Sequence, residues 1–317
     1  MPCYSPLTAY RSKTPTRNGK QGIVFGIIGS TGEKLQVPCG QCIGCREKRT
    51  REWSARIMHE SELHAENCFI TLTYDPAHLP TDGSLDHTHF QKFLKRLRKR
   101  LVGKKIRYFM CGEYGEKYSR PHYHAIIFGW DPHDKELFFT RQGVDCFTSD
   151  TLTRLWGKGH CTVGDVTVES AGYTARYCLK KLTGKALDKM DEATGLKPYE
   201  VVDFYGEINT IKPEYARMSL KNGIGYEWFQ KYHADVFPHD EVIVKTKQGK
   251  FRRMLPPRYY GNIFELTEPE LYADIKNQRQ MAVEAQKRNL TPERLAARLE
   301  YKQAQMSRLP RKLENPQ

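Results

Sequence analysis

Two histidines stand two residues apart at the start of an apolar run, in the segment Arg120-Pro-His-Tyr-His-Ala-Ile-Ile-Phe-Gly129. Side chains of a β-strand alternate between its two faces, so a strand here places His122 and His124 side by side. Two neighbouring imidazoles can hold a divalent metal ion. The segment therefore predicts an apolar strand with a metal site where the strand begins.

The upstream acids can complete such a site, because hard divalent ions also bind oxygen ligands. Glu113 lies at the end of a strand predicted over residues 106–111, and the following turn can return the chain into the histidine strand. Glu116 lies in the turn itself and is the weaker candidate. The predicted ligands are Glu113, His122 and His124. Imidazole ligands favour Mn²⁺, while cellular abundance favours Mg²⁺.

About fifty residues later, a helix predicted from Ser170 onward carries two tyrosines and two lysines on one face. Tyr173, Tyr177, Lys180 and Lys181 stand at i, i+4, i+7 and i+8. A phenol has a pKa near 10 and attacks a phosphate poorly unless a metal or a lysine makes the phosphorus more electrophilic. Two tyrosines on a helix are by themselves usually core aromatics. The neighbouring lysines favour a catalytic pair.

The N-terminal region contains cysteines at metal-ligand spacing, in Cys39-Gly-Gln-Cys42-Ile-Gly-Cys45. Cys3 can supply a fourth thiolate, and the four would then bind a structural Zn²⁺ ion. His59 or His64 can replace Cys3 as a ligand, and an iron–sulfur cluster is an alternative occupant. The remaining cysteines are expected to act as small buried hydrophobic residues: Cys68, Cys111, Cys146, Cys161 and Cys178.

The charge balance favours a polyanionic partner. Lys and Arg number 51 against 37 acidic residues, which leaves a net charge of +14. A run of basic residues and the arginine before the metal motif are predicted to contact DNA: Lys95, Arg96, Arg98, Lys99, Arg100 and Arg120. No apolar run reaches the roughly 18 residues that cross a bilayer, and the first residues have no apolar signal-peptide core. Nine cysteines without export indicate reduced thiols.

The order of predicted elements indicates an α+β fold with a central antiparallel sheet and helices packed on one face. Strands are predicted at 68–74, 106–111, 122–129 and 161–168, and helices at 45–66, 86–101 and after Ser149 and Ser170. The chain divides into four predicted segments: a Cys-rich segment 1–60, a core 61–185, an extension 186–262 that packs on the core, and a polar helical tail 263–317.

These motifs resemble those of HUH endonucleases with two tyrosines, and more closely the replication initiators of gokushovirus-type microviruses. Phe69-Ile-Thr-Leu-Thr-Tyr74 is similar to the first family motif, Arg120 to His124 to the metal motif, and Tyr173 to Lys181 to the nucleophile motif. The cysteine segment and Pro256-Pro-Arg-Tyr-Tyr260 also resemble the gokushovirus proteins. The similarity covers residues 1–262. It departs mildly at Tyr123, where the broad family often has a bulky aliphatic residue.

The resemblance implies a sheet of the HUH or RRM-like palm type and rolling-circle replication. One tyrosine is expected to join the 5′-phosphate of nicked phage origin DNA, and the free 3′-hydroxyl to prime a host polymerase assisted by a host helicase. The second tyrosine is expected to act in the strand transfer that closes the circle, with a lysine positioning the phosphate. The expected location is the cytoplasm of the infected bacterium.

Three alternatives can be weighed at the sequence level. A transposase or a plasmid mobilisation relaxase would use the same HUH chemistry. A non-catalytic, zinc-dependent DNA-binding protein would use the histidines structurally. A metallohydrolase barrel would need eight strand–helix repeats, which the sequence does not show.

Overall fold

The structure is a computed structural model, and it describes residues 3–17, 19, 21–115, 118–141, 143–177, 187–202, 205–237, 239–246 and 249–307, without the side chain of Tyr177. The described chain forms two compact units. Residues 3–49 and 270–307 form the smaller unit, and residues 50–269 form the larger one. The four segments expected from the sequence stay predictions.

The larger unit is built on an antiparallel sheet, which in the described residues has seven strands in the order β12-β5-β6-β4-β9-β8-β7. The central strands are β4 (Asn67–Thr73), β5 (Arg107–Tyr114) and β6 (Pro121–Phe128). The others are β7 (Lys135–Arg141), β8 (Val144–Ser149), β9 (Cys161–Gly164) and β12 (Tyr215–Met218). The predicted α+β class and central antiparallel sheet are confirmed.

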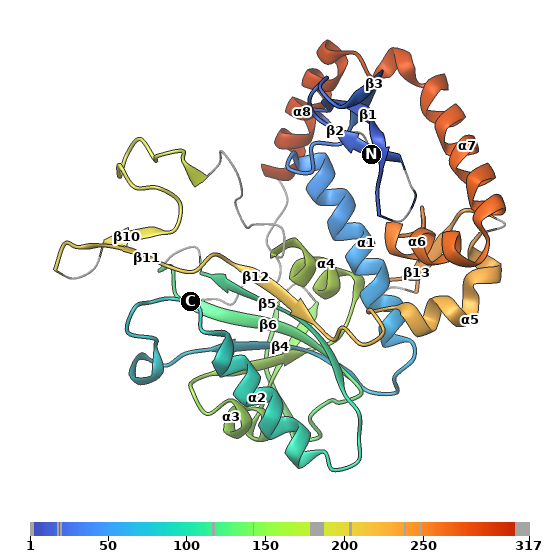
Figure 1. The fold of residues 1–317 in the computed structure, drawn as a ribbon. Helices are drawn as coiled ribbons and strands as arrows, with labels where there is room; N and C mark the ends of the chain where they lie inside the picture. Colours follow the sequence, from blue (N-terminus) through green and yellow to red (C-terminus); the bar gives the residue numbers. More distant parts are fainter. Residues whose placement is uncertain are drawn as a thin grey trace. The chain divides into compact units, whose positions relative to one another are not determined.

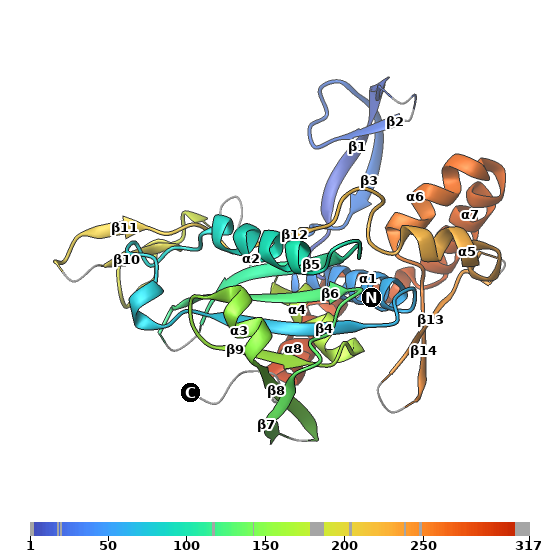
Figure 2. The ribbon, with the colours of Figure 1, turned by 90° about the horizontal axis from the view of Figure 1, so that it is seen from below.

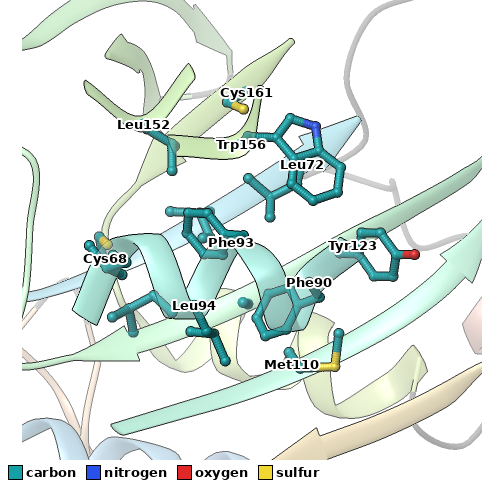
Figure 3. Close-up of a cluster of buried hydrophobic side chains, with 14 of the residues drawn as sticks. Cys68, Leu72, Phe90, Phe93, Leu94, Met110, Tyr123, Leu152, Trp156 and Cys161 are labelled. Atoms are coloured by element: carbon teal, nitrogen blue, oxygen red, sulfur yellow. The ribbon is translucent and has the colours of Figure 1, made fainter. Parts of the chain in front are cut away.

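One face of this sheet is covered by α2 (His87–Arg100) and α3 (Asp150–Trp156). The apolar stripe of α2, which recurs every three or four residues, places Phe90, Phe93 and Leu97 against the sheet. Trp156 and Tyr123 belong to the same core, which combines aromatic and aliphatic side chains (Figure 3). Ser149 caps α3 as the sequence predicts, because its hydroxyl accepts a hydrogen bond from the backbone N–H of Leu152.

The opposite face is covered by α4 (Val168–Tyr177) and by the second half of α1 (Ile43–Ser61). Figure 1 shows α4 on the side of the sheet away from α2 and α3. Helices therefore cover both faces of the sheet and not one face alone. The reason is that the alternate positions of β4, β5 and β6 are apolar on both sides, so the second face needs cover as well.

Further elements of the larger unit lie outside the seven-stranded sheet. These are the hairpin β10 (Glu200–Val202) and β11 (Ile208–Thr210), helices α5 (Tyr226–Val236) and α6 (Arg258–Thr267), and the hairpin β13 (Val242–Lys245) and β14 (Phe251–Met254). Figure 2 shows both hairpins as narrow two-stranded ribbons. Pro76–His78 forms a single 3-10 turn after β4.

The smaller unit combines a three-stranded sheet with two helices. Its strands, in the order β2-β1-β3, are β1 (Leu7–Pro15), β2 (Gln21–Val24) and β3 (Ser30–Val37). Helices α7 (Pro269–Ala285) and α8 (Pro292–Ser307), with a 3-10 turn at Lys287–Asn289 between them, confirm the predicted helical C-terminal region. Lys302 on α8 lies 3.0 Å from a carboxylate oxygen of Glu47 at the start of α1.

Candidate active site

Strand register places three potential metal ligands on one face of the larger sheet. Glu113 of β5 lies directly opposite His122 of β6, and His124 follows two residues later on the same face. Glu113 is therefore the cross-strand neighbour of His122 that the sequence predicts. Glu113 lies inside β5, since this strand continues to Tyr114 and not only to residue 111.

The three side chains converge on a small volume. Glu113 Oε1 lies 2.8 Å from Nε2 of His122 and 2.9 Å from Nε2 of His124. One ligand atom of each residue lies within 4.8 Å of the others. Glu113 and His124 are buried, whereas His122 is half-buried and gives the site one open side.

The carboxylate is held in its charged form. Burial raises the pKa of Glu113, but hydrogen bonds from His122 and His124 outweigh it, and the pKa lies below its ordinary value. Its second oxygen, Oε2, is buried and has no hydrogen-bond donor among the described residues. A buried carboxylate oxygen without a donor is costly unless a cation binds it. This orphaned oxygen and the two imidazoles fit a divalent ion.

The Nδ1 atom of each histidine has a partner of its own. Nδ1 of His122 lies 3.1 Å from the carbonyl oxygen of Arg120, which can only accept, so Nδ1 carries the proton. Nδ1 of His124 lies 2.9 Å from the hydroxyl of Thr71 on β4. Such contacts orient the rings so that each Nε2 faces Glu113; Nε2 donates to the carboxylate here and would give up its proton to bind a metal. Sequence reasoning missed Thr71, because the pairing of β4 with β6 cannot be read from spacing.

The first of the two predicted tyrosines lies beside this cluster. The ring of Tyr173 on α4 stands perpendicular to the ring of His124, with the ring centres 5.0 Å apart. Phe69 stacks on the ring of His124, with the ring centres 5.6 Å apart, and contacts Tyr173 edge-on at 6.3 Å. The structure thus brings the imidazole-bearing strand and the phenol-bearing helix together at Tyr173.

The helix that carries Tyr173 begins earlier than the sequence predicts. The cap predicted at Ser170 is wrong, since α4 starts at Val168 and the hydroxyl of Thr167 accepts the backbone N–H of Ser170. Thr and Ser are both good N-caps, and residue type alone did not distinguish them. The side chain of Tyr177 lies outside the described residues, as do Lys180, Lys181, Cys178 and Glu116.

The structure also brings the four N-terminal cysteines together, in the smaller unit. One sulfur atom from each of Cys3, Cys39, Cys42 and Cys45 lies within 4.8 Å of the others. The two histidines considered as substitutes have other partners. His59 contacts the hydroxyl of Tyr260 at 2.9 Å, and His64 contacts Glu60 at 3.3 Å. Cys68, Cys111 and Cys161 are buried as expected, and Cys146 is half-buried.

Of the predicted DNA-contacting residues, the five on α2 lie away from the metal ligands, whereas Arg120 lies beside His122. Lys95, Arg98, Lys99 and Arg100 are exposed on α2, which covers the other face of the sheet. Arg96 has an internal role, since its guanidinium donates to the carbonyl oxygens of Leu155 and Trp156 at the end of α3. Arg120 donates to the carbonyl oxygen of Tyr74 at 2.9 Å. A role of these residues in DNA binding stays a prediction.

In the part of the chain that the structure describes, no helix combines the length and apolar character that crossing a bilayer requires.

Comparison with known proteins finds relatives of a single kind. A family described as "Replication-associated protein ORF2/G2P" matches residues 67–182, the span that holds the three potential metal ligands and Tyr173. The replication-associated protein VP4 of Bdellovibrio phage phiMH2K is 36% identical over 247 residues, which cover 75% of this chain and 70% of that protein.

Two further relatives carry similar names. The replication-associated protein ORF2 of Spiroplasma virus 4 is 35% identical over 257 residues, covering 77% of this chain and 73% of that protein. The replication-associated protein ORF4 of Chlamydia phage 1 is 38% identical over 153 residues, covering 46% of this chain and 38% of that protein. No solved structure shows significant similarity to the chain.

Proposed function

Because this chain belongs to the phage replication-associated proteins, we propose that it initiates rolling-circle replication by nicking one strand of the phage origin and becoming covalently joined to it through a tyrosine. The observation that carries the proposal is the 5.0 Å separation between the rings of Tyr173 and His124. The attacking tyrosine and the metal ligands must reach the same phosphate group of the DNA. Tyr173 and His124 lie close enough together to do so.

Glu113, His122 and His124 would hold Mg²⁺ or Mn²⁺, which as a Lewis acid would make the phosphorus more electrophilic and stabilise the developing negative charge. The phenol oxygen of a tyrosine attacks the phosphorus. A new bond forms between the tyrosine oxygen and phosphorus, and the bond from phosphorus to the 3′-oxygen breaks. The phenol proton is lost and the departing 3′-oxygen takes up a proton, so the exchange is balanced without any redox partner.

The two tyrosines of α4 allow the reaction to run twice. The phosphotyrosine ester conserves the energy of the broken phosphodiester, so a 3′-hydroxyl can later attack it and reseal a strand. Tyr177 follows Tyr173 by one helical turn and is proposed to alternate with it. We assign to Lys180 or Lys181 the positioning of the phosphate or the protonation of the leaving oxygen.

The remaining partners follow from this activity. The free 3′-hydroxyl would prime a host DNA polymerase, and a host helicase would separate the strands ahead of it. Both enzymes and the origin DNA would be met in the cytoplasm of the infected bacterium.

The test is a covalent-adduct gel with single-stranded origin DNA and Mn²⁺. The double variant Tyr173→Phe/Tyr177→Phe is expected to form no adduct, while each single variant retains one nucleophile and still forms some. His122→Ala is expected to slow adduct formation at least about a hundredfold. DNA affinity should stay within about threefold, since phosphate contacts by Lys and Arg dominate binding.

Tyr301→Phe provides the matched control, because Tyr301 is an exposed tyrosine on α8. An adduct that persists undiminished in the double variant would exclude the tyrosine mechanism. Binding without adduct in the unaltered protein would favour the non-catalytic DNA-binding alternative.

A further inference from the structure

Four cysteine sulfurs meet within the smaller unit, and none of them belongs to a residue of the proposed nicking reaction. Cys3 precedes β1, Cys39 follows β3, and Cys42 and Cys45 flank the first residues of α1. Leu7, the first residue of β1, pairs with Val37, the last residue of β3. The start of β1 and the end of β3 therefore lie side by side, and each is a few residues from a cysteine of the cluster.

The spacing of the sulfurs matches a metal site and not a disulfide. Sγ of Cys42 lies 3.8 Å from Sγ of Cys3. A disulfide would require about 2.05 Å. A tetrahedral zinc site with zinc–sulfur bonds of about 2.3 Å places its sulfur atoms about 3.8 Å apart. Four sulfurs within 4.8 Å of one another are close to this arrangement.

Backbone groups support the sulfur atoms as negatively charged ligands. The N–H of Cys39 donates to Sγ of Cys3 at 3.2 Å, and the N–H of Cys42 donates to Sγ of Cys39 at 3.3 Å. The N–H of Tyr4 donates to Sγ of Cys42 at 3.4 Å. Donors aimed at sulfur orient thiolate ligands and stabilise their charge, as outer contacts do in metal sites.

The smaller unit has too little apolar core to hold its sheet by packing. Among its described residues, the buried hydrophobic side chains are those of Ala9, Tyr272 and Leu295. Units with so small a core commonly depend on a disulfide or a structural metal. Reduced thiols in a cytoplasm leave the metal as the available cross-link.

We propose that Cys3, Cys39, Cys42 and Cys45 bind one structural Zn²⁺ ion, which joins the ends of β1 and β3 to the start of α1 and is required for the smaller unit to stay folded. The site is closed by four protein ligands and has no position for a substrate, so its role is structural. It is independent of the Glu113, His122 and His124 site.

The first measurement is the metal content of the full chain, purified without added metal and without a metal-binding tag. Elemental mass spectrometry is expected to find about one zinc per chain. Exchange with Co²⁺ is expected to give the intense visible bands of tetrahedral cobalt–thiolate. Cys42→Ser and Cys45→Ser should each lower zinc content at least fivefold. Cys146→Ser, a half-buried cysteine of β8, is the matched control and should leave it unchanged.

The second measurement tests the structural role and needs no variant. Removing zinc with a strong chelator is expected to expose residues 3–42 to limited proteolysis at least tenfold faster, while the sheet of the larger unit stays protected. Less than a tenth of a zinc per chain, iron in its place, a mass loss of two hydrogens from a disulfide, or unchanged zinc in both serine variants would each overturn the proposal. The covalent-adduct gel is a separate readout, so the nicking reaction and the zinc site can fail independently.

Discussion

At the scale of single residues, the candidate site depends on how its ligands are aimed. Nδ1 of His124 can be protonated only if its partner accepts, and the hydroxyl of Thr71, 2.9 Å away, can do so. Nε2 then faces Glu113 and is the nitrogen that would bind a metal once its own proton is released. We infer that Thr71 positions His124 without touching DNA.

Thr71→Val removes this acceptor while keeping the β-branched shape that suits a strand. We expect Mn²⁺ affinity to fall about 10- to 100-fold, the usual effect of losing such an outer contact. Titration of Mn²⁺ by its paramagnetic resonance signal measures this directly, before any DNA is added. Nicking at saturating Mn²⁺ should recover much of the loss.

Thr71→Ser keeps the hydroxyl and should restore binding. Thr162→Val is the matched control, because Thr162 is also buried and pairs with Thr71 from the neighbouring strand β9. If Thr162→Val weakened Mn²⁺ as much as Thr71→Val, the effect would come from strand packing and the positioning role would be lost.

At the scale of elements, β4, which carries Thr71, pairs with β9 on its other side. The segment before β9 runs very close to the end of β4. The backbone N–H of Thr73 donates to the carbonyl of His160, and that of Asp75 donates to the carbonyl of Lys158. Gly159 lies between these bonds with φ +143°, and a Cβ there would lie 2.3 Å from the backbone nitrogen of Asp75.

Gly159→Ala should therefore destabilise the larger unit by at least about 2 kcal/mol, from the strained φ and the backbone clash together. Thermal unfolding followed by circular dichroism measures the loss. Gly143→Ala is the control, because Gly143 has φ +74° but open space around it, so only the backbone strain of about 1 kcal/mol applies. Equal losses in the two variants would show that the close approach contributes nothing.

The helices and strands differ in how well the sequence predicts them. β4, β6, α2 and α3 carry regular apolar patterns or caps and were predicted within a few residues. The hairpin β7–β8 was missed, because Leu137 and Phe138 are both exposed and a bulge between Leu137 and Phe139 breaks the alternation. Glu113 could be predicted as a neighbour of His122, because two strands close in sequence commonly pair antiparallel. The contact between Thr71 and His124 could not, because it depends on the pairing of β4 with β6, about fifty residues apart in the sequence.

At the scale of the whole chain, the net charge of +14 indicates an electrostatic contribution to DNA binding. The larger unit separates its features between two faces of one sheet. Glu113, His122, His124 and Tyr173 lie on the face covered by α4, while the basic side of α2 lies on the other. One phosphate cannot contact both. The exposed lysines of α2 are therefore expected to bind a different stretch of DNA from the one that is nicked.

Replacing Lys95 and Lys99 by Gln tests this separation. The double variant should bind long origin DNA more weakly and reduce the slope of log affinity against log salt by about two, since each lost phosphate contact removes about one. Its rate of adduct formation on a short single-stranded oligonucleotide at saturating concentration should stay unchanged.

Replacing the exposed Lys287 and Arg288 by Gln removes the same formal charge from the smaller unit and controls for net charge. If both variants shifted the slope equally, binding would reflect overall charge and α2 would have no contact of its own. If the α2 variant also slowed the short substrate, the two faces would act on one DNA segment, contrary to the arrangement of the sheet.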